Sequence, residues 1–182
     1  MGKPTEETAD RGLSPRVVVI AVWGVAGVLA LLAQALIRLT PLAIEPLEKH
    51  MLSSWQLVLY VLWAVANAYA EGYRGFQKSF SPRVVARALH LGRNPRPIHV
   101  LFAPAFCMAL FHAKRKNLLL SWGLTTFIVL AVILTRQLPQ PWRGIVDVGV
   151  VVGLVWGAIS IVVIFARALT GRHEPTTDSL PV

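Results

Sequence analysis

The sequence is poor in charged residues and has a single cysteine. Charged residues make up 15% of its 182 positions, whereas a soluble domain carries about a quarter. Cys107 alone cannot form a disulfide within the chain, which excludes a disulfide-stabilised scaffold. Hydrophobic residues reach 55%, and the mean hydropathy is +0.58. The composition therefore predicts a membrane protein and excludes a disordered or collagen-like chain.

Motifs that carry catalysis or bind metals are also lacking. The sequence contains no Gly-x-Ser-x-Gly elbow, no phosphate-binding loop and no paired carboxylates inside an apolar run. Its five histidines are scattered, and His99 and His112 would stand about 20 Å apart on a straight helix, too far to share one ion. We therefore expect no catalytic residue, no metal site and no cofactor. Aromatic-interleaved basic motifs are missing too, which argues against nucleic acid as a partner.

Four apolar runs are long enough, or nearly so, to cross a bilayer, whose core takes about 20 helical residues. They cover residues 17–39, 51–70, 118–134 and 145–169. A fifth run, 98–112, contains Pro104 near its middle and would reach only about 22 Å as a helix. The sequence thus predicts an all-α integral membrane protein with four transmembrane helices, between tails at residues 1–16 and 170–182.

The positions of the basic residues predict the orientation. If 98–112 does not cross, most of the 18 Lys and Arg residues lie on the same side as both termini. A crossing would move Lys114, Arg115 and Lys116 to the opposite side. Because Lys and Arg accumulate on the cytoplasmic side, we expect four spans and two cytoplasmic termini, in a bacterial cytoplasmic (inner) membrane. Residues 98–112 then form a bent re-entrant or interface-lying segment.

The loop after the second span is strongly basic. Ser81 and Pro82 predict the start of a short amphipathic cytoplasmic helix. Such a helix would lie in the headgroup layer, where each basic side chain contributes about 1 kcal/mol beside anionic lipid. The residues expected to contact anionic lipid headgroups are Arg83, Arg87, Arg93, Arg96, Lys114, Arg115 and Lys116.

Polar residues also mark the inner end of the second span. On a continued α-helix, their spacing of three and four places on one face Asn67, Glu71, Arg74 and Gln77. Ionisable groups at membrane depth are costly and often functional. Because these residues come at the predicted border of the span, the simpler interpretation is an interfacial Glu71–Arg74 ion pair that closes the bundle.

The last span carries three glycines at four-residue spacing, Gly149, Gly153 and Gly157. Such a stripe forms a groove that another helix can approach closely. The pattern leaves open whether that helix belongs to the same chain, to a second copy in a homo-oligomer or to a partner membrane protein. Near the outer end of this span, Asp147 follows Arg143 by one turn, and this pair is expected to anchor the helix end.

Three functions fit these features. The first is a non-enzymatic accessory or assembly subunit that packs through its last span and contacts anionic lipid or an acidic partner through its basic loop. The second is a small oligomeric transporter or channel, in which the polar face of the second span lines the pathway. The third, a membrane enzyme acting on lipid headgroups, would need as its acid or base His90, His99 or His112.

Overall fold

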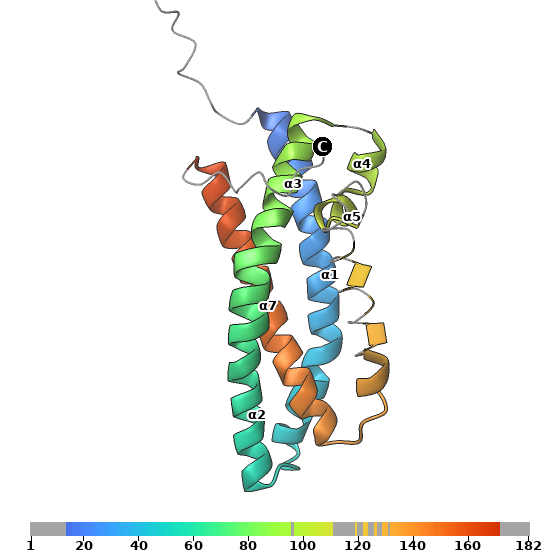
Figure 1. Cartoon of the computed structure of the whole chain (residues 1–182), viewed down its shortest axis with the longest axis vertical. Coiled ribbons are helices and arrows are strands. Elements are labelled where there is room, and N and C mark those ends of the chain that lie inside the picture. The colour runs from blue at the N-terminus through green and yellow to red at the C-terminus, as the bar shows by residue number, and fades with distance from the viewer. Residues whose placement is uncertain are drawn as a thin grey trace, which may run out of the picture.

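The structure is a computed structural model that describes residues 14–95, 97–110 and 132–171, with the single positions 119, 122, 123, 126, 129 and 130 between them. Every regular element in these residues is a helix (Figure 1). The elements are α1 (Pro15–Glu48), α2 (Ser54–Asn67), the π-helix η1 (Ala68–Phe80), α3 (Ser81–Arg93), α4 (Pro97–Leu101), α5 (Ala103–Cys107) and α7 (Trp142–Leu169). The predicted all-α class is confirmed.

The first helix is longer than the sequence predicts. α1 has 34 residues, which corresponds to about 51 Å, and it continues past residue 39 through Pro41 and Pro46. A proline inside a helix removes one backbone hydrogen bond. Pro46 nevertheless lies inside the helix, buried against Gly144 at the start of α7. Contact with α7 therefore helps to keep the last turns of α1 helical.

α2, η1 and α3 follow one another without a break and form one long helix from Ser54 to Arg93. The two junction residues are both helical, Asn67 with φ −73° and ψ −33° and Phe80 with φ −74° and ψ −52°. α-helical winding begins at Ser81 as predicted, but the chain is already helical before it, so Ser81 does not cap a new helix. Pro82 lies where π-helical winding changes to α-helical winding, and it lacks the N–H that would donate a backbone hydrogen bond there.

α3 does not lie on the surface as a headgroup-layer helix. Val84, Val85 and Ala88 are fully buried, in a core that also holds Val25 of α1 and Ile161 of α7. The continuous long helix carries α3 alongside these two helices, so its apolar face packs against protein. The prediction of a separate amphipathic helix on the membrane surface is therefore corrected.

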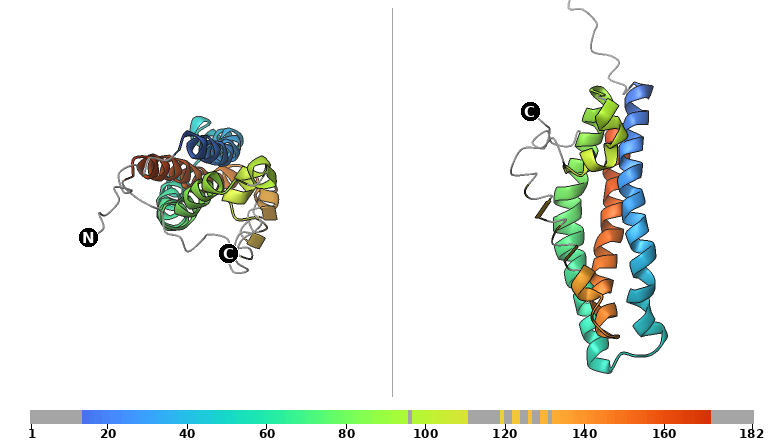
Figure 2. Two further views of the ribbon diagram at one scale, coloured as in Figure 1. Left: turned by 90° about the horizontal axis from the view of Figure 1, so that it is seen from above. Right: turned by 90° about the vertical axis from the view of Figure 1, so that its right-hand side faces the viewer.

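The long helix, α1 and α7 form the body of the molecule. α1 runs antiparallel to the other two (Figures 1 and 2). α7 lies between α1 and the long helix in the right-hand view of Figure 2, and in Figure 1 it crosses obliquely from beside the end of α1 to the far side of α3. The loop 49–53 and the residues before Trp142 lie at one end, here called the lower end. The start of α1, the end of α3 and the end of α7 lie at the opposite, upper end.

The bent apolar run forms two short helices at the upper end, separated by Phe102. α5 packs on α1, where Gly27 leaves room for Pro104 and Gly24 leaves room for Cys107. The indole nitrogen of Trp23 donates a hydrogen bond to the carbonyl of Val100 at 3.1 Å. α4 and α5 therefore rest against the upper part of α1. The end of the predicted segment, residues 111–112, lies outside the described residues.

Two helices, α1 and α7, are long and apolar enough to cross a membrane. Only 28% of the most apolar stretch of α1 and 33% of that of α7 are buried, so most of these side chains face outwards, as a lipid-exposed helix requires. The structure describes nine of the 17 positions of the predicted third span, 118–134, and these nine are helical. Most of both predicted tails lies outside the described residues.

Candidate functional site

The glycine stripe of α7 lies against the long helix of the same chain. A Cβ added at Gly149 would lie 2.6 Å from Nε1 of Trp63, and one at Gly153 would lie 3.0 Å from Oε2 of Glu71. At Gly157 it would collide with the ring of Phe76. These glycines thus allow α2 and η1 to approach α7 closely, and their groove is filled from within the chain.

In a second close contact between η1 and α7, the glycine belongs to η1 and the large side chain to α7. Gly72 of η1 leaves room for Trp156 of α7, whose Cγ would lie 2.8 Å from a Cβ at that glycine. The indole nitrogen of Trp156 donates a hydrogen bond to Oε1 of Gln77 at 2.8 Å. η1 therefore lies beside the central turns of α7 and does not continue beyond the end of that helix.

The four polar residues predicted to share a face have different environments. Asn67 is buried and donates through Nδ2 to the carbonyl of Trp63 at 2.8 Å, and Gln77 accepts from Trp156. Glu71 and Arg74 are exposed, and no ion pair joins them. The interpretation as a Glu71–Arg74 pair is therefore wrong. It assumed α-helical neighbours three residues apart, whereas π-helical winding sets neighbours five residues apart.

η1 has eight exposed residues. Two of them are Tyr69, which stacks on Tyr73, and Gln77, which is bonded to Trp156. The other six are called the η1 face below: Ala70, Glu71, Arg74, Gly75, Lys78 and Ser79. Lys78 has a contact within the chain, because its Nζ lies 4.6 Å from the ring centroid of Tyr73. Tyr73 in turn stacks on Tyr69 at 5.8 Å between centroids. Within the described part of the chain, Glu71 and Arg74 are left as exposed charges of opposite sign with no ion-pair partner.

Arg87, predicted to contact lipid headgroups, is fully buried. Its Nε donates a 2.6 Å hydrogen bond to the carbonyl of Phe106, and its guanidinium lies 4.3 Å from the centroid of the Phe106 ring. The ring of His99 stacks on Phe106, 5.0 Å between centroids. Arg87 therefore joins α3 to α5, and its headgroup assignment is corrected. Its apolar neighbours Val85 and Ala88 are the signal that could have indicated burial.

The other predicted headgroup residues have varied positions. Arg83 donates to the carbonyl and hydroxyl oxygens of Ser79, at 2.8 and 3.1 Å, and Arg93 is exposed at the upper end of α3. Four residues of the set lie outside the described residues: Arg96, Lys114, Arg115 and Lys116. Of the histidines named for catalysis, His99 is buried and His112 is not described.

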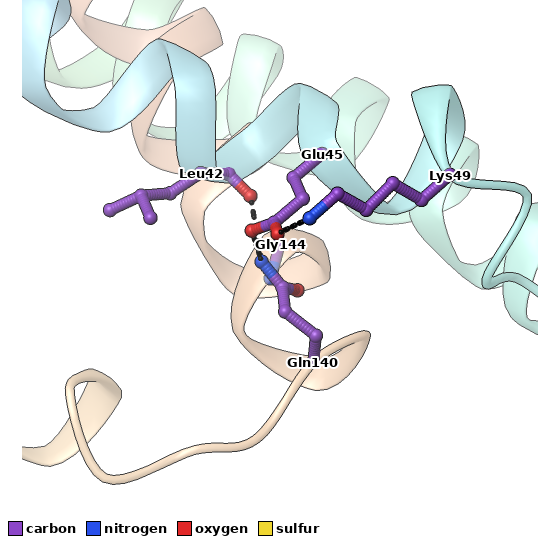
Figure 3. Close-up of polar contacts among 5 residues, drawn as sticks. All are labelled: Leu42, Glu45, Lys49, Gln140 and Gly144. Carbon is purple, nitrogen blue, oxygen red and sulfur yellow. Dashed lines mark hydrogen bonds and ion pairs between the residues drawn. The ribbon is translucent and has the colours of Figure 1, made fainter.

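A polar contact at the lower end was not predicted from the sequence (Figure 3). Nε2 of Gln140 donates to the Leu42 carbonyl at 3.2 Å and to Oε2 of Glu45 at 2.9 Å, and Oε1 of Gln140 accepts from the Gly144 N–H at 3.1 Å. Lys49 donates to Oε1 of Glu45 at 2.6 Å. These bonds tie the end of α1 to the start of α7. They hold the pKa of Glu45 below its ordinary value, chiefly through Lys49.

The predicted Arg143–Asp147 pair is present at the same end. Nε of Arg143 lies 3.6 Å from Oδ2 of Asp147, and Asp147 is 4% exposed. Oδ2 accepts no hydrogen bond in the structure, so the contact is an ion pair of poor hydrogen-bond geometry. The pair lies in the first turns of α7, as the expected anchoring role requires.

The described residues offer little support for metal binding or for thiol chemistry. Among the residues that it describes, no three or more His, Cys, Asp or Glu side chains come together to hold a metal ion. Burial raises the pKa of the Cys107 thiol to about 12, which leaves little reactive thiolate at neutral pH. Comparison of the chain with protein-family models, with curated proteins and with solved structures finds no match.

Proposed function

We propose that this chain is a four-span integral protein of a bacterial cytoplasmic membrane, with both termini in the cytoplasm. We further propose that it is a non-enzymatic assembly subunit that binds another transmembrane helix through the η1 face. The distribution of basic residues supports the orientation. The length and outward-facing apolar surface of α1 and α7 support the membrane location.

The depth of η1 supports the binding role. Trp55 and Trp142 pack together at the lower end, 5.5 Å between centroids, as in the aromatic belt of a membrane border. Taking Ile145 as the start of the apolar core, Gly153 is about 12 Å and Trp156 about 16 Å inside a core of about 30 Å. Glu71, beside Gly153, and Gln77, beside Trp156, would then lie near the middle of the bilayer.

The observation that carries the proposal is the exposure of Glu71 and Arg74 at this level of α7. An Arg, Lys or Asp at the centre of a membrane helix costs about 2.5–3.5 kcal/mol on insertion scales. Asn67 and Gln77 are satisfied within the chain. Arg74 is exposed. Glu71 is also exposed, at the edge where η1 meets α7, with its Oε2 against Gly153. A polar group on a neighbouring transmembrane helix would remove much of this cost, and lipid would not.

The lipid contacts remain part of the proposal, without Arg87. The residues proposed to contact anionic headgroups on the cytoplasmic side are Arg83, Arg93, Arg96 and the stretch Lys114–Lys116. An acidic partner protein is the alternative ligand for this surface. These contacts would set the height of the protein in the membrane, whereas the η1 face would select the neighbouring helix.

Site-specific photocrosslinking in native membranes tests the proposal. A photoreactive residue at Arg74 or Lys78 is expected to form a crosslink to a protein, because both positions belong to the η1 face. The matched control is Val155, which is exposed on α7 next to Trp156 and so lies at the depth of η1; it is expected to yield lipid adducts only. Lipid adducts alone from all three positions would contradict the proposal.

The oligomeric transporter is the second candidate, and the same exposed charges favour it. Groups that line a pathway contact water, whereas groups in a helix interface do not. Cysteines placed at Ala70 and Ser79 would react quickly with a water-soluble thiol reagent if the η1 face lines a pathway. Slow reaction at both positions, with fast reaction at Asn94 of the upper end, would favour the assembly subunit.

A further inference from the structure

We propose that the helix bound by the η1 face is the η1 face of a second copy of this chain, with the two copies parallel and Glu71 of each facing Arg74 of the other. This inference rests on the proposed function, because it names the partner of the same surface. The proposed function alone does not identify this partner, because a transmembrane helix of a different protein could also bind the η1 face.

Charge complementarity points to a second copy. The η1 face carries three charges. Lys78 lies over the Tyr73 ring, and Glu71 and Arg74, one of each sign, are three residues apart. Oε2 of Glu71 lies against Gly153 of α7, so a partner would reach this carboxylate at the edge where η1 meets α7. A two-fold axis along the membrane normal places identical residues of two copies at the same depth. Glu71 and Arg74 then differ in height by less than about 4.5 Å, which the arginine side chain can span. The surface is thus complementary to itself, and each association forms two ion pairs.

The small residues of the η1 face permit a close approach. Ala70, Gly75 and Ser79 are all exposed. A Cβ at Gly75 would meet only the Ala70 carbonyl oxygen, at an ordinary 3.5 Å. The glycines of α7, by contrast, are already covered by the long helix. Small residues let two membrane helices approach closely enough for short polar side chains to meet.

Towards the lower end, the outward surface of α2 next to the η1 face is apolar. Val58, Leu62, Val65 and Tyr69 are each more than half exposed and recur at three- and four-residue spacing, which places them along one side of the helix. A parallel second copy would pack these residues against their equivalents in the outer half of the membrane. The polar pairs near the middle of the membrane would then specify the register of the two helices.

Charge reversal tests the pairing in full-length protein reconstituted into vesicles. E71R alone and R74E alone each place like charges opposite one another and are expected to weaken self-association by about tenfold or more. The double variant E71R/R74E restores complementarity and is expected to associate like the wild type. A mixture of the two single variants forms complementary mixed pairs, so resonance energy transfer between donor-labelled E71R and acceptor-labelled R74E should reach the wild-type level.

A steric variant separates association from folding. Gly75→Leu fills open space in the single chain, so its thermal unfolding temperature should not fall, while its energy transfer should disappear. Gly123→Leu is the matched control, because a Cβ there has no neighbour within 4 Å and lies outside the η1 face. It should leave energy transfer unchanged.

The outcomes distinguish the inference from the proposed function. A wild-type protein that stays monomeric in vesicles, or a double variant and a mixture that both fail to associate, would overturn the second-copy inference. If the Arg74 photocrosslink then joins a different protein, the proposed function stands without it. If neither self-association nor a protein crosslink is found, both are overturned.

Discussion

Arg87 shows how one residue can be misassigned by its charge. An arginine in a basic loop beside a membrane is normally placed at the headgroups, yet Arg87 is fully buried and bonded to the Phe106 carbonyl of α5. Its neighbours in sequence are apolar and its helix continues the bundle, which brings it inside. The number of basic residues in a loop predicts the side of the membrane, but it does not predict which of them are exposed.

Removing Arg87 should loosen α5. Arg87→Ala loses the hydrogen bond and the ring contact with Phe106 and leaves a cavity above Cys107. We expect maleimide to label Cys107 about tenfold faster in folded Arg87→Ala than in the wild type, because local opening becomes easier. Arg93→Ala, at an exposed position of the same helix, is the control and should label like the wild type. Equal rates for all three proteins would show that Arg87 does not hold α5.

Glu45 and Lys49 predict a pH dependence at the lower end. The hydrogen bond from Lys49 lowers the pKa of Glu45 from 4.5 and, through the same bond, raises the pKa of Lys49 from 10.5. The stabilisation is therefore complete between these two values. It is lost as the pH falls through the lowered pKa of Glu45 or rises through the raised pKa of Lys49.

The measurement is thermal unfolding in mild detergent at several pH values. Glu45→Gln should unfold at a lower temperature than the wild type at pH 7, by less than about 3 °C because both side chains are solvent-screened. At pH 3 the difference should shrink. Glu48→Gln, at the residue before Lys49, is the matched control. Glu48 affects Lys49 only through its charge and less than Glu45 does, so this variant should differ less from the wild type at pH 7. A difference that grows on acidification would contradict the assigned pairing.

At the scale of elements, long apolar runs predicted where helices form, but they did not predict whether a helix has α or π geometry. The runs 17–39 and 145–169 correspond to α1 and α7, because an apolar stretch of that length has few alternatives to a helix. The π-helix could not be predicted. Its hydrogen-bond register depends on contacts distant in sequence, Gly72 with Trp156 and Phe76 with Gly157. Without it, neither the depth of Glu71 nor its separation from Arg74 could be inferred.

The glycine contacts between α7 and the long helix should be intolerant of added volume. In Gly157→Ala the new methyl group would overlap the Phe76 ring, which must move out of its packed position. Overpacking of this kind costs about 1–3 kcal/mol. Thermal unfolding in detergent should therefore show a clear loss for Gly157→Ala, and Gly123→Ala, where a methyl group meets nothing within 4 Å, should show none. Unchanged unfolding of Gly157→Ala would contradict the packing of η1 against α7.

For the molecule as a whole, the helix directions restrict the possible topologies. α1 descends while the long helix and α7 ascend, so the start of α1 and the end of α7 lie at the same end. This agrees with an even number of crossings, since the chain must return from α5 to the lower end before α7 begins. The number of spans stays a prediction, because eight of the 17 residues at 118–134 are not described.

Cysteine labelling in intact cells tests this topology. With Cys107 replaced by serine, a membrane-impermeant maleimide should label Met51→Cys and Leu138→Cys, which are exposed at the lower end. Asn94→Cys, exposed at the upper end, should react only after the membrane is permeabilised, because the basic residues place that end in the cytoplasm. Labelling of Asn94→Cys in intact cells, with protection of the other two, would reverse the orientation. Labelling of Met51→Cys without Leu138→Cys would mean that the two loops lie on opposite sides, which the shared lower end of α1 and α7 does not allow.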